Sequence, residues 1–597
     1  MIIRFATIFT VIALGFVCVL IKIVAIQTFE REQWMKIAEQ QEKANLIIQP
    51  RRGNILDAHG NLLASSLPQY YIYMDTRVEA LHLKGGKLFY EYVDSIADGL
   101  SRIIGDNSAA AYRQRMVKAY RGKRYKECCI KLSDKRINFI QKKQIEQLPL
   151  IKRGLYKSGV YFEAQNRRAK PYGSLASRTI GNLYGQEQKG YSGLEMQFDN
   201  YLRGKEGVST RQRVAGRWQN VPVREAENGC DIVTTLDANL LDICETALRA
   251  RLDKTQADWG CCILMETHSG EIKAICNLDR TEDGNYYESA NHAVTRVEPG
   301  STFKTIALMA AMDDGKIDID DTVSVTRKPW MYNGLKHTDA HPNDTVYTVR
   351  SALAISSNIA LAKIITESYE KKATKFVKKL TEMGITDSVY IEIPGATNPL
   401  IRVPKDAGTL SKMSYGYSVE LSPIQIIMFY NGIANDGKMI RPFLVKEIRK
   451  NGRTIEQFET SVVKSALCKH STLEDIKLAL HDVVWDDSLA GTASVIKGTR
   501  IRKAQSQLVH IAGKTGTAQI SENGRYYNNR HRMTFVGYFP EEDPQYTCLC
   551  MIQHPRNAGG YDAGLDCGIV VRQIAEKTIA TTGFTIYKRG QKHFVKR

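Results

Sequence analysis

An apolar stretch near the start of the chain limits its architecture more than any other sequence feature. Residues Phe5–Ile21 carry no charge, and after Lys22 the apolar run continues to Ile26. Crossing the hydrocarbon core of a membrane takes about 20 residues, and Lys22 can extend its amine to the interface. No small-x-small cleavage site follows, which favours an uncleaved anchor over a removed signal peptide. The alternative is a buried helix at the edge of a domain.

The charges that flank this stretch say little about its orientation. Arg4 and the amino terminus precede it, whereas Arg31 and Lys36 follow it. The rule that positive charges stay on the cytoplasmic side therefore barely decides between the two orientations. No second stretch of this kind follows, so we expect the rest of the chain to lie on one side of a membrane.

Length and charge narrow the class of protein. At roughly 150 residues per domain, 597 residues predict two to four domains. Ordinary proportions of hydrophobic residues (43%) and charged residues (25%) exclude wholesale disorder, collagen-like repeats and a multi-span membrane protein. Lys and Arg total 83 against 64 acidic residues, a formal charge of +19. This excess favours anionic surroundings such as nucleic acid, anionic lipid or an acidic polymer.

The cysteines fit no metal-binding pattern. Two adjacent pairs, Cys128-Cys129 and Cys261-Cys262, and the spaced pair Cys548 and Cys550 occur without any C-x-x-C. We expect most of the thiols to be buried small hydrophobes. An extracytoplasmic body would permit disulfides, but the sequence does not specify pairs.

A strongly basic segment lies in the amino-terminal half. Residues 110–157 contain 15 Lys or Arg against 3 Asp or Glu. The spacing of Ile137, Phe139, Ile140 and Ile145 predicts helices with a solvated basic face; a binding face for an acidic polymer or partner is the alternative. Nucleic acid is disfavoured because the chain has no aromatic platform or base-reading motif.

A polar stretch with four glycines, Arg203–Gly229, marks the main domain boundary. Before it, residues 30–43 predict a helical linker, and the segment 51–66 predicts a hairpin around His59-Gly60. Beyond it, strand-like text is followed by helical text from 301 to 383, and strands return after Leu508. This order predicts one sheet covered by helices.

Ser301-Thr302-Phe303-Lys304 is the first segment that suggests chemistry. Pro299-Gly300 ends the preceding segment, and residues 305–312 form a helical run, so Ser301 is expected at a helix start with Lys304 on the same face. A neutral lysine could take the serine proton, and free N–H groups at the helix start could stabilise an oxyanion. The S-x-x-K pattern is weak alone, because it recurs at Ser368/Lys371, Ser461/Lys464 and Ser494/Lys497.

Two further segments add polar groups. Ser356-Ser357-Asn358 interrupts two helical stretches, although a helix cap would explain it equally well. Residues 513–518, Gly-Lys-Thr-Gly-Thr-Ala, lie in a strand-like run, and K-T-G occurs once in the chain. Glycine inside a strand often marks a close approach of another backbone. A cation, two hydroxyls and a strand edge suit an extended peptide with a terminal carboxylate.

The order S-x-x-K, S-x-N, K-T-G is typical of penicillin-recognising serine acyl-transferases. With the anchor and the basic amino-terminal half, the chain resembles a class B penicillin-binding protein. Further segments carry the resemblance along nearly the whole chain: Arg52–Asp57 (R-G-x-I-x-D), Gly193–Glu195 with Leu202-x-Gly204, Glu298-Pro299-Gly300, Ser414–Tyr417 and Ser422–Gln425. Ala58-His59 departs from the Arg-Asn-like pair usual in the family, which concerns the pedestal and not the chemistry.

The resemblance implies an α+β multidomain fold. It comprises a single N-terminal transmembrane helix, an elongated α+β pedestal and a penicillin-recognising serine transferase domain with an antiparallel sheet covered by helices. The expected limits are residues 1–4 for a cytoplasmic tip, 5–26 for the anchor, 27–225 for the pedestal or dimerisation-like domain, 226–590 for the transpeptidase domain and 591–597 for a basic tail. No glycosyltransferase segment is found before the expected pedestal, so we expect a monofunctional protein and not a bifunctional class A protein.

The resemblance also implies roles for the first two motifs. Ser301 would attack the penultimate D-alanine carbonyl of a peptidoglycan stem peptide and expel the last D-alanine, with Lys304 as the base. Ser356 would relay the proton to the leaving amine, and Asn358 would hold Lys304 and the substrate amide.

The third motif would bind the substrate. Lys514, Thr515, Gly516 and Thr517 are the expected binding residues; Lys514 and Thr515 would hold the terminal carboxylate, and Lys514 would help to keep Lys304 neutral. The backbone N–H groups of Ser301 and Thr517 would form the oxyanion hole. The amine of a second stem peptide would resolve the acyl-enzyme into a crosslink, and β-lactams would acylate Ser301.

We expect no cofactor and no metal. His337 and His341 have a metal-ligand spacing, but Gly334 and Pro342 flank them and the text predicts a loop. The expected partners are stem peptides or the lipid-linked precursor, β-lactams, and a membrane-embedded glycosyltransferase with other division proteins, but no nucleic acid. The expected location is the bacterial inner membrane, single-pass, with the bulk of the chain periplasmic.

Three alternatives stay open. A β-lactam sensor or β-lactamase shares the three motifs but needs no long pedestal, and an inactive scaffold is disfavoured by the intact motifs. Within the family, Tyr415-Gly416-Tyr417 and short catalytic-domain loops lean towards the division-specific type over the elongation-specific type.

Overall fold

The computed structural model describes residues 2–28, 30–31, 46–185, 188–214, 217–488, 491–496, 498–522, 525–557, 561–583, 587–588 and 591–592. Its contacts divide the chain into two units, Met1–Gly53 with Arg203–Cys230, and Asn54–Leu202 with Asp231–Arg597. Most of the predicted linker (32–43) and the end of the predicted tail (593–597) lie outside the described residues.

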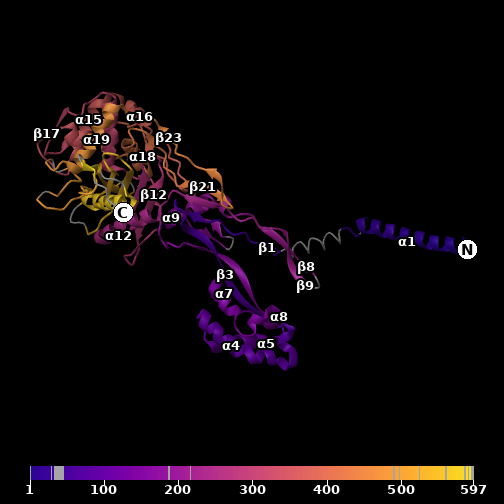
Figure 1. The fold of residues 1–597 in the computed structure, drawn as a ribbon. Helices are drawn as coiled ribbons and strands as arrows, with labels where there is room; N and C mark the ends of the chain where they lie inside the picture. Colours follow the sequence, from indigo (N-terminus) through magenta and orange to yellow (C-terminus); the bar gives the residue numbers. More distant parts are fainter. Residues whose placement is uncertain are drawn as a thin grey trace. The chain divides into compact units, whose positions relative to one another are not determined.

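The first unit contains one long helix and a small sheet. Helix α1 runs over Ile2–Thr28, and strand β1 (Leu46–Ile48) pairs with β8 (Gly207–Val214), which pairs with β9 (Arg217–Arg224) (Figure 1). Within the described part of the chain, no helix combines the length and apolarity that a membrane crossing requires. Side chains at 5–8, 11–12 and 26 of the predicted anchor lie outside the described residues.

The second unit begins with the predicted hairpin. Strands β2 (Ile55–Leu56) and β3 (Leu62–Asp75) pair antiparallel, as the segment 51–66 predicts. The same sheet continues through β10 (Asp231–Thr234), β21 (Val445–Lys450) and β22 (Arg453–Gln457) on one side of β2. Segments on either side of the glycine-rich stretch therefore share one sheet.

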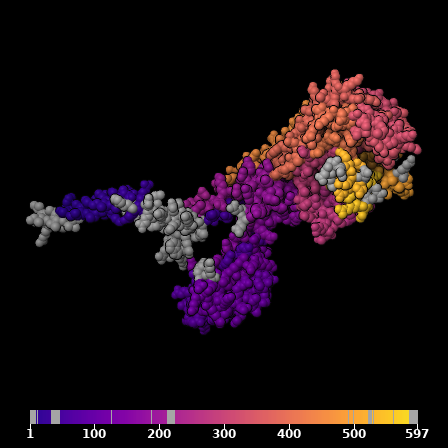
Figure 2. Space-filling model, turned by 180° about the vertical axis from the view of Figure 1, so that it is seen from behind, coloured from indigo at the N-terminus to yellow at the C-terminus, as the bar shows by residue number. Residues whose placement is uncertain are grey.

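The C-terminal half of β3 belongs to a lobe, here called the head, that has its own hydrophobic core between residues 72 and 160. Strands β4 (Cys129–Lys131) and β5 (Val160–Ala169) flank β3, and helices α4 (Lys87–Ile104), α5 (Ala109–Tyr120) and α7 (Phe139–Glu146) pack against them. Figure 2 shows this head as a violet lobe. Asn138 caps α7 in a capping box, and Ile137 and Ile145 enter the core whereas Phe139 and Ile140 stay exposed.

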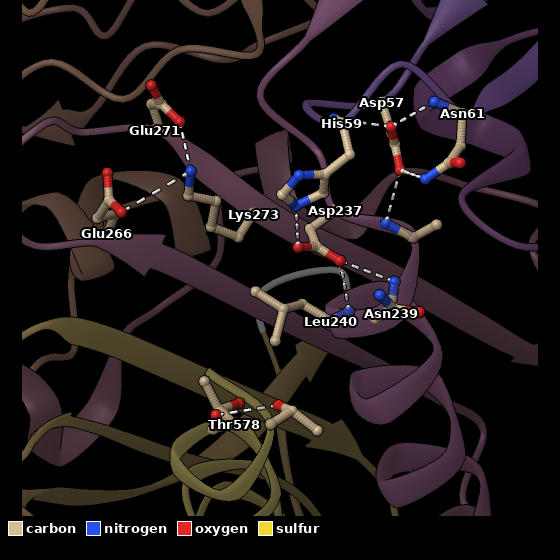
Figure 3. Close-up of polar contacts among 12 residues, drawn as sticks. Asp57, His59, Asn61, Asp237, Asn239, Leu240, Glu266, Glu271, Lys273 and Thr578 are labelled. Carbon is tan, nitrogen blue, oxygen red and sulfur yellow. Dashed lines mark hydrogen bonds and ion pairs between the residues drawn. The ribbon is translucent and has the colours of Figure 1, made fainter. Parts of the chain in front are cut away.

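A buried aspartate holds the β2–β3 turn against residues 231–583, the part of the second unit that carries the three motifs and is called the catalytic half below. Asp57 is fully buried and accepts hydrogen bonds from the N–H groups of His59, Asn61 and Ala238 and from the Asn61 side chain (Figure 3). The ring of His59 points to Asp237, with Nε2 2.9 Å from Oδ2. The departure from the family at His59 thus lies at the start of helix α12 (Ala238–Thr255).

The catalytic half is built on a six-stranded antiparallel sheet. Its order is β13-β12-β11-β26-β25-β24, with bounds Trp259–Glu266 (β11), Ile272–Arg280 (β12), Tyr286–Tyr287 (β13), Ala512–Glu522 (β24), Arg525–Phe539 (β25) and Tyr546–Gln553 (β26). This pairing places β26 beside β11, which lies almost 300 residues earlier in the chain, and leaves β24 at an edge. The predicted sheet covered by helices is confirmed.

Helices cover both faces of this sheet (Figure 1). Cys276 faces α12, where its thiol contacts the Leu241 carbonyl, and α20 (Ile569–Thr582) packs on the same side. Thr547 faces the opposite side and donates to Asn431 in α18 (Pro423–Ala434). Beyond α18 lies α13 (Phe303–Asp313), which is buried along its whole length and packs against α15 (Asn358–Tyr369), α16 (Ala373–Glu382) and α19 (His470–Trp485).

Most of the thiols are buried, as predicted. All twelve are free; Cys18 is exposed, Cys129 and Cys468 are half-buried, and the others are buried. The sulfur atoms of Cys262 and Cys548 lie 3.9 Å apart on the face toward α12. They fill the space between the sheet and this helix as small hydrophobic side chains.

Candidate active site

Ser301 lies in a tight turn that leads into the central helix. A single 3₁₀ turn spans Gly300–Thr302, and α13 begins at Phe303, so the predicted helix start is displaced by two residues. Gly300 has φ +56°, and a Cβ there would lie 2.9 Å from the Ala518 Cβ. Glycine is therefore required at this position both by the backbone conformation and by the close approach of β24.

Lys304, in the first turn of α13, is fully buried. Its Nζ donates to the carbonyl oxygen of Ser356 at 2.5 Å and to the Ser356 hydroxyl at 3.1 Å. Burial lowers the pKa of Lys304 to about 7, and the nearby carboxylate of Asp339 opposes this shift. An amine with such a pKa exists partly in the neutral form at neutral pH, which is the form that can accept a proton.

The Ser356 turn joins helix α14 (Val349–Ala354) to α15. Ser356 has φ +60°, a left-handed conformation that is uncommon for a residue with a side chain. The helix cap is Ser357, whose Oγ accepts from the N–H of Ala360. Of the two serines, only Ser357 therefore acts as a helix cap. The carbonyl and the hydroxyl of Ser356 accept from Lys304 instead.

Asn358 begins α15, and its side-chain amide donates to the carbonyl of Thr338 at 2.8 Å. Its backbone N–H and that of Ile359 both donate to Asp339. The loop that carries Thr338 and Asp339 therefore holds the start of α15 on two sides.

The K-T-G segment lies on the edge strand β24. Lys514 is fully buried, and its Nζ donates to the Thr515 carbonyl at 3.0 Å. Burial lowers the pKa of Lys514 well below its usual range, and the positive charge of Lys304 lowers it further. The hydroxyl of Thr515 lies 2.6 Å from that of Thr492. Two lysines thus share one buried region and disfavour each other's protonation.

Gly516 brings the edge strand against the nucleophile turn. A Cβ at Gly516 would lie 2.9 Å from Cγ2 of Thr302 and 3.3 Å from both its N atom and the Pro299 carbonyl. The close backbone approach predicted for this glycine is confirmed. Thr517, the next residue on the strand, contacts the sulfur of Met533 through its hydroxyl at 3.7 Å.

The fold thus brings all three motifs to one place. Lys304 and Ser356 are joined by hydrogen bonds, Lys304 is close enough to Lys514 to lower the pKa of Lys514, and Gly516 packs on the turn of Ser301. A serine, a lysine of lowered pKa and a strand edge beside them can carry out acyl transfer through a serine ester. In the described part of the chain, no three His, Cys, Asp or Glu side chains are arranged to hold a metal ion.

Two residues that support this site, Tyr430 and Asp339, lie outside the three motifs and are not predicted from the sequence. Tyr430 in α18 donates to the Thr302 carbonyl and accepts from the Thr305 hydroxyl, both at 2.9 Å, and so supports the turn that leads into α13. Asp339 holds the start of α15 and influences Lys304. Neither lies in a motif, and no local signal in the sequence connects either residue to the site.

The segment around the two histidines differs in part from its prediction. A hairpin of β15 (Trp330–Tyr332) and β16 (Leu335–His337) replaces the predicted loop up to His337, whereas residues 338–344, with His341, form a loop as predicted. His337 at its end is buried and lies between the Tyr415 and Ser411 hydroxyls, at 2.9 Å and 3.2 Å, whereas His341 is exposed. Because His337 is buried and both of its ring nitrogens are hydrogen-bonded to protein side chains, its role is structural.

Known families match both halves of the chain. The penicillin binding protein transpeptidase domain matches residues 260–576, and the penicillin-binding protein dimerisation domain matches residues 47–234. Among curated proteins, the probable peptidoglycan D,D-transpeptidase PenA of Neisseria meningitidis is 26% identical over 71% of this chain and 70% of its own length. Stage V sporulation protein D of Bacillus subtilis is 24% identical over 91% of this chain and 80% of its own. Peptidoglycan D,D-transpeptidase FtsI of Buchnera aphidicola is 23% identical over 95% and 93%.

Solved structures share the fold. Penicillin binding protein 2X from Streptococcus thermophilus has a TM-score of 0.75 at 21% identity, covering 90% of this chain and 80% of its own. Penicillin binding protein 3 from Mycobacterium tuberculosis, complexed with aztreonam, has a TM-score of 0.64 at 19% identity, covering 90% and 97%. Both matches extend over most of this chain.

Proposed function

This chain belongs to the penicillin-binding protein transpeptidase family as a class B peptidoglycan D,D-transpeptidase, and on that premise we propose how its residues carry out the reaction. The observation that carries the proposal is the position of Lys304: a buried amine one helical turn from Ser301, joined to Ser356 and facing a second buried lysine.

Acylation begins with neutral Lys304. Ser301 Oγ attacks the carbonyl carbon of the penultimate D-alanine while its proton passes to Lys304 Nζ. The N–H groups of Ser301 and Thr517 stabilise the oxyanion that forms. The C–N bond to the last D-alanine then breaks, and the leaving nitrogen receives a proton through the Ser356 hydroxyl.

The substrate lies along the edge of β24. Lys514 and Thr515 bind its terminal carboxylate, and Gly516 lets the strand reach the nucleophile turn. Asn358 contacts the substrate amide. In the second half-reaction, the amine of another stem peptide attacks the serine ester, a new peptide bond forms and Ser301 regains its proton. A β-lactam forms the same ester at Ser301 by opening its ring.

The site residues are tested by covalent labelling. A fluorescent penicillin should label the full-length protein one-to-one at Ser301, and Ser301→Ala should abolish the label. Matched controls are the serines of the other S-x-x-K patterns, so Ser368→Ala, Ser461→Ala and Ser494→Ala should label as the wild type does. Mass spectrometry that places the adduct on another serine would refute the assignment.

We also propose an extracytoplasmic site of action. Residues 5–26 anchor the chain in the bacterial cytoplasmic membrane, and the bulk lies outside the cytoplasm, where peptidoglycan is assembled. The uncharged apolar sequence Phe5–Ile21 supports this proposal. A reporter that is active only outside the cytoplasm, fused after Arg597, should be active; activity of a cytoplasm-only reporter there would reverse the orientation.

Septal synthesis is the role that we propose within the cell, with a membrane-embedded glycosyltransferase and other division proteins as partners. The segment Tyr415–Tyr417 and the short loops of the catalytic half support the division type. Depletion of the protein should give filaments, whereas spherical cells would indicate the elongation type.

A further inference from the structure

The hairpin β15–β16 ends in a residue that is firmly fixed. His337 is 1% exposed, accepts a hydrogen bond from the Tyr415 hydroxyl at Nδ1, and donates from Nε2 to Ser411 Oγ, whose own proton is directed to the Gly408 carbonyl. Burial and the nearby Lys412 lower the pKa of His337, so the ring is neutral. The chain that leaves this anchor reaches Asp339 two residues later.

Asp339 binds the beginning of α15 with both carboxylate oxygens. Oδ1 accepts from the N–H groups of Asn358 at 2.5 Å and Ile359 at 3.0 Å, and Oδ2 accepts from the Ser357 hydroxyl at 2.8 Å. Free N–H groups and the positive end of the dipole make a helix N-terminus a favourable place for a carboxylate. Asp339, 19 positions before the first residue of the helix, thus acts as an additional cap.

Ser356 directly precedes these three residues in the chain. Its left-handed backbone aims its carbonyl and its hydroxyl at Lys304 Nζ. An L-residue holds this conformation only when its surroundings fix it. The contacts of Asp339 to Ser357, Asn358 and Ile359 fix the three residues that directly follow.

We propose that Asp339 is a positioning residue for acyl transfer, which holds the Ser356–Asn358 turn in place and whose negative charge sets the pH range in which Lys304 accepts a proton. The proposal rests on the proposed function of the site. It extends the machinery beyond the three motifs to a loop that none of them contains.

The charged groups that face Lys304 come from two elements. Burial lowers the pKa of Lys304, whereas Asp339, from the loop after β16, raises it; Lys514, from β24, is a second titratable group in this region, and its own pKa is lowered by burial and by Lys304. From α18, Tyr430 contacts Thr302 and Thr305 on either side of Lys304 in the sequence, and because burial raises its pKa it stays neutral. Removal of the Asp339 charge should therefore make Lys304 lose its proton at lower pH.

The test measures the rate of acylation by fluorescent penicillin from pH 5 to pH 10 with the full-length protein. Asp339→Asn keeps the shape and removes the charge, so the rising limb of the profile should move to lower pH by about half a unit or more. Asp339→Ala removes the hydrogen bonds as well and should reduce the plateau rate by about tenfold or more, because the geometry of Ser356 relaxes.

Asp344→Asn is the matched control. It makes the same change in the same loop, where the carboxylate accepts only from the N–H of Arg327 at 2.8 Å among its described contacts, and it should leave the profile unchanged. If Asp339→Asn melts far below the wild type, Asp339→Glu provides the second test: it retains the charge and should keep the position of the limb while lowering the plateau.

The outcomes separate the two proposals. A wild type that carries no adduct on Ser301 refutes the proposed function. A wild type labelled at Ser301 together with a profile for Asp339→Asn that overlays both the wild type and Asp344→Asn refutes the role of Asp339 and leaves the proposed function intact.

Discussion

Lys304 Nζ lies 2.5 Å from the carbonyl oxygen of Ser356 and 3.1 Å from its hydroxyl, and Ser356 presents both groups from a left-handed backbone with φ +60°. One residue therefore supplies two acceptors to the buried amine. The left-handed conformation costs an L-residue roughly 1–2 kcal/mol. The chain carries this strain at the point where the proposed proton transfer takes place, as strained residues often do at functional sites.

Substitution of Ser356 should reveal this strain. Ser356→Gly removes the hydroxyl and also the steric conflict of the left-handed backbone, whereas Ser356→Ala removes the hydroxyl alone. We expect Ser356→Gly to be more stable than Ser356→Ala by about 1 kcal/mol, although glycine also gains entropy in the unfolded chain. Denaturant unfolding of both variants measures the difference. If Ser356→Ala is the more stable variant, the backbone strain is not stored at this residue.

A neutral substitute for Lys304 should stabilise the fold at neutral pH. Burial lowers the pKa of this amine to about 7, against about 10.4 in an unfolded chain. Between these two values the unfolded chain binds more protons, so the wild type loses stability as the pH falls from about 10 to 7. Lys304→Met removes this loss. Its melting temperature should exceed that of the wild type at pH 7, and the difference should shrink towards pH 10, while penicillin labelling disappears.

Lys379→Met is the control with the opposite sign. Burial opposes the charge of Lys379, but Asp313 and Asp314 raise its pKa above the usual range. Loss of this amine leaves two carboxylates without their cation, so the variant should melt below the wild type at pH 7. Equal effects of the two substitutions would show that the charge of Lys304 is not the source of the difference.

The residue types of the site could be predicted from sequence, but its geometry could not. The motifs predict which residues meet in the site: Ser301, Lys304, Ser356 and Lys514. They also predict the helix start or the strand on which each residue lies. The left-handed backbone of Ser356 and the contacts of Asp339 depend on how a hairpin packs against α17 (Ala407–Met413), and no local pattern encodes such packing. Likewise, the alternation of strands and helices predicted a covered sheet, whereas the placement of β26 beside β11 is a long-range pairing that periodicity does not specify.

Gly516 should be sensitive to a single methyl group. The Cβ of an alanine there would lie 2.9 Å from Cγ2 of Thr302, so either the edge strand or the nucleophile turn must move. We expect Gly516→Ala to lower the rate of penicillin acylation by about tenfold or more, since small displacements of a reacting group are costly. Stopped-flow labelling and thermal melting measure rate and stability separately. An unchanged rate with unchanged melting would mean that the strand and the turn are free to separate.

The Asp57 turn offers a test of stability away from the proposed active site. Asp57 is fully buried and accepts from three backbone N–H groups and one side-chain amide. Asp57→Ala leaves these donors unsatisfied, and a buried unsatisfied group costs roughly 1–3 kcal/mol. His59→Ala, two residues away, removes only a side chain whose partner is Asp237 and which is 63% exposed, so its cost should stay below about 1 kcal/mol. The melting temperature should therefore be highest for the wild type, lower for His59→Ala and lowest for Asp57→Ala.

Both variants should still carry the penicillin adduct on Ser301 at low temperature, because neither side chain has a described contact with the three motifs. If His59→Ala were the more damaging substitution, the ion pair with Asp237, and not the buried carboxylate, would hold the β2–β3 turn against α12.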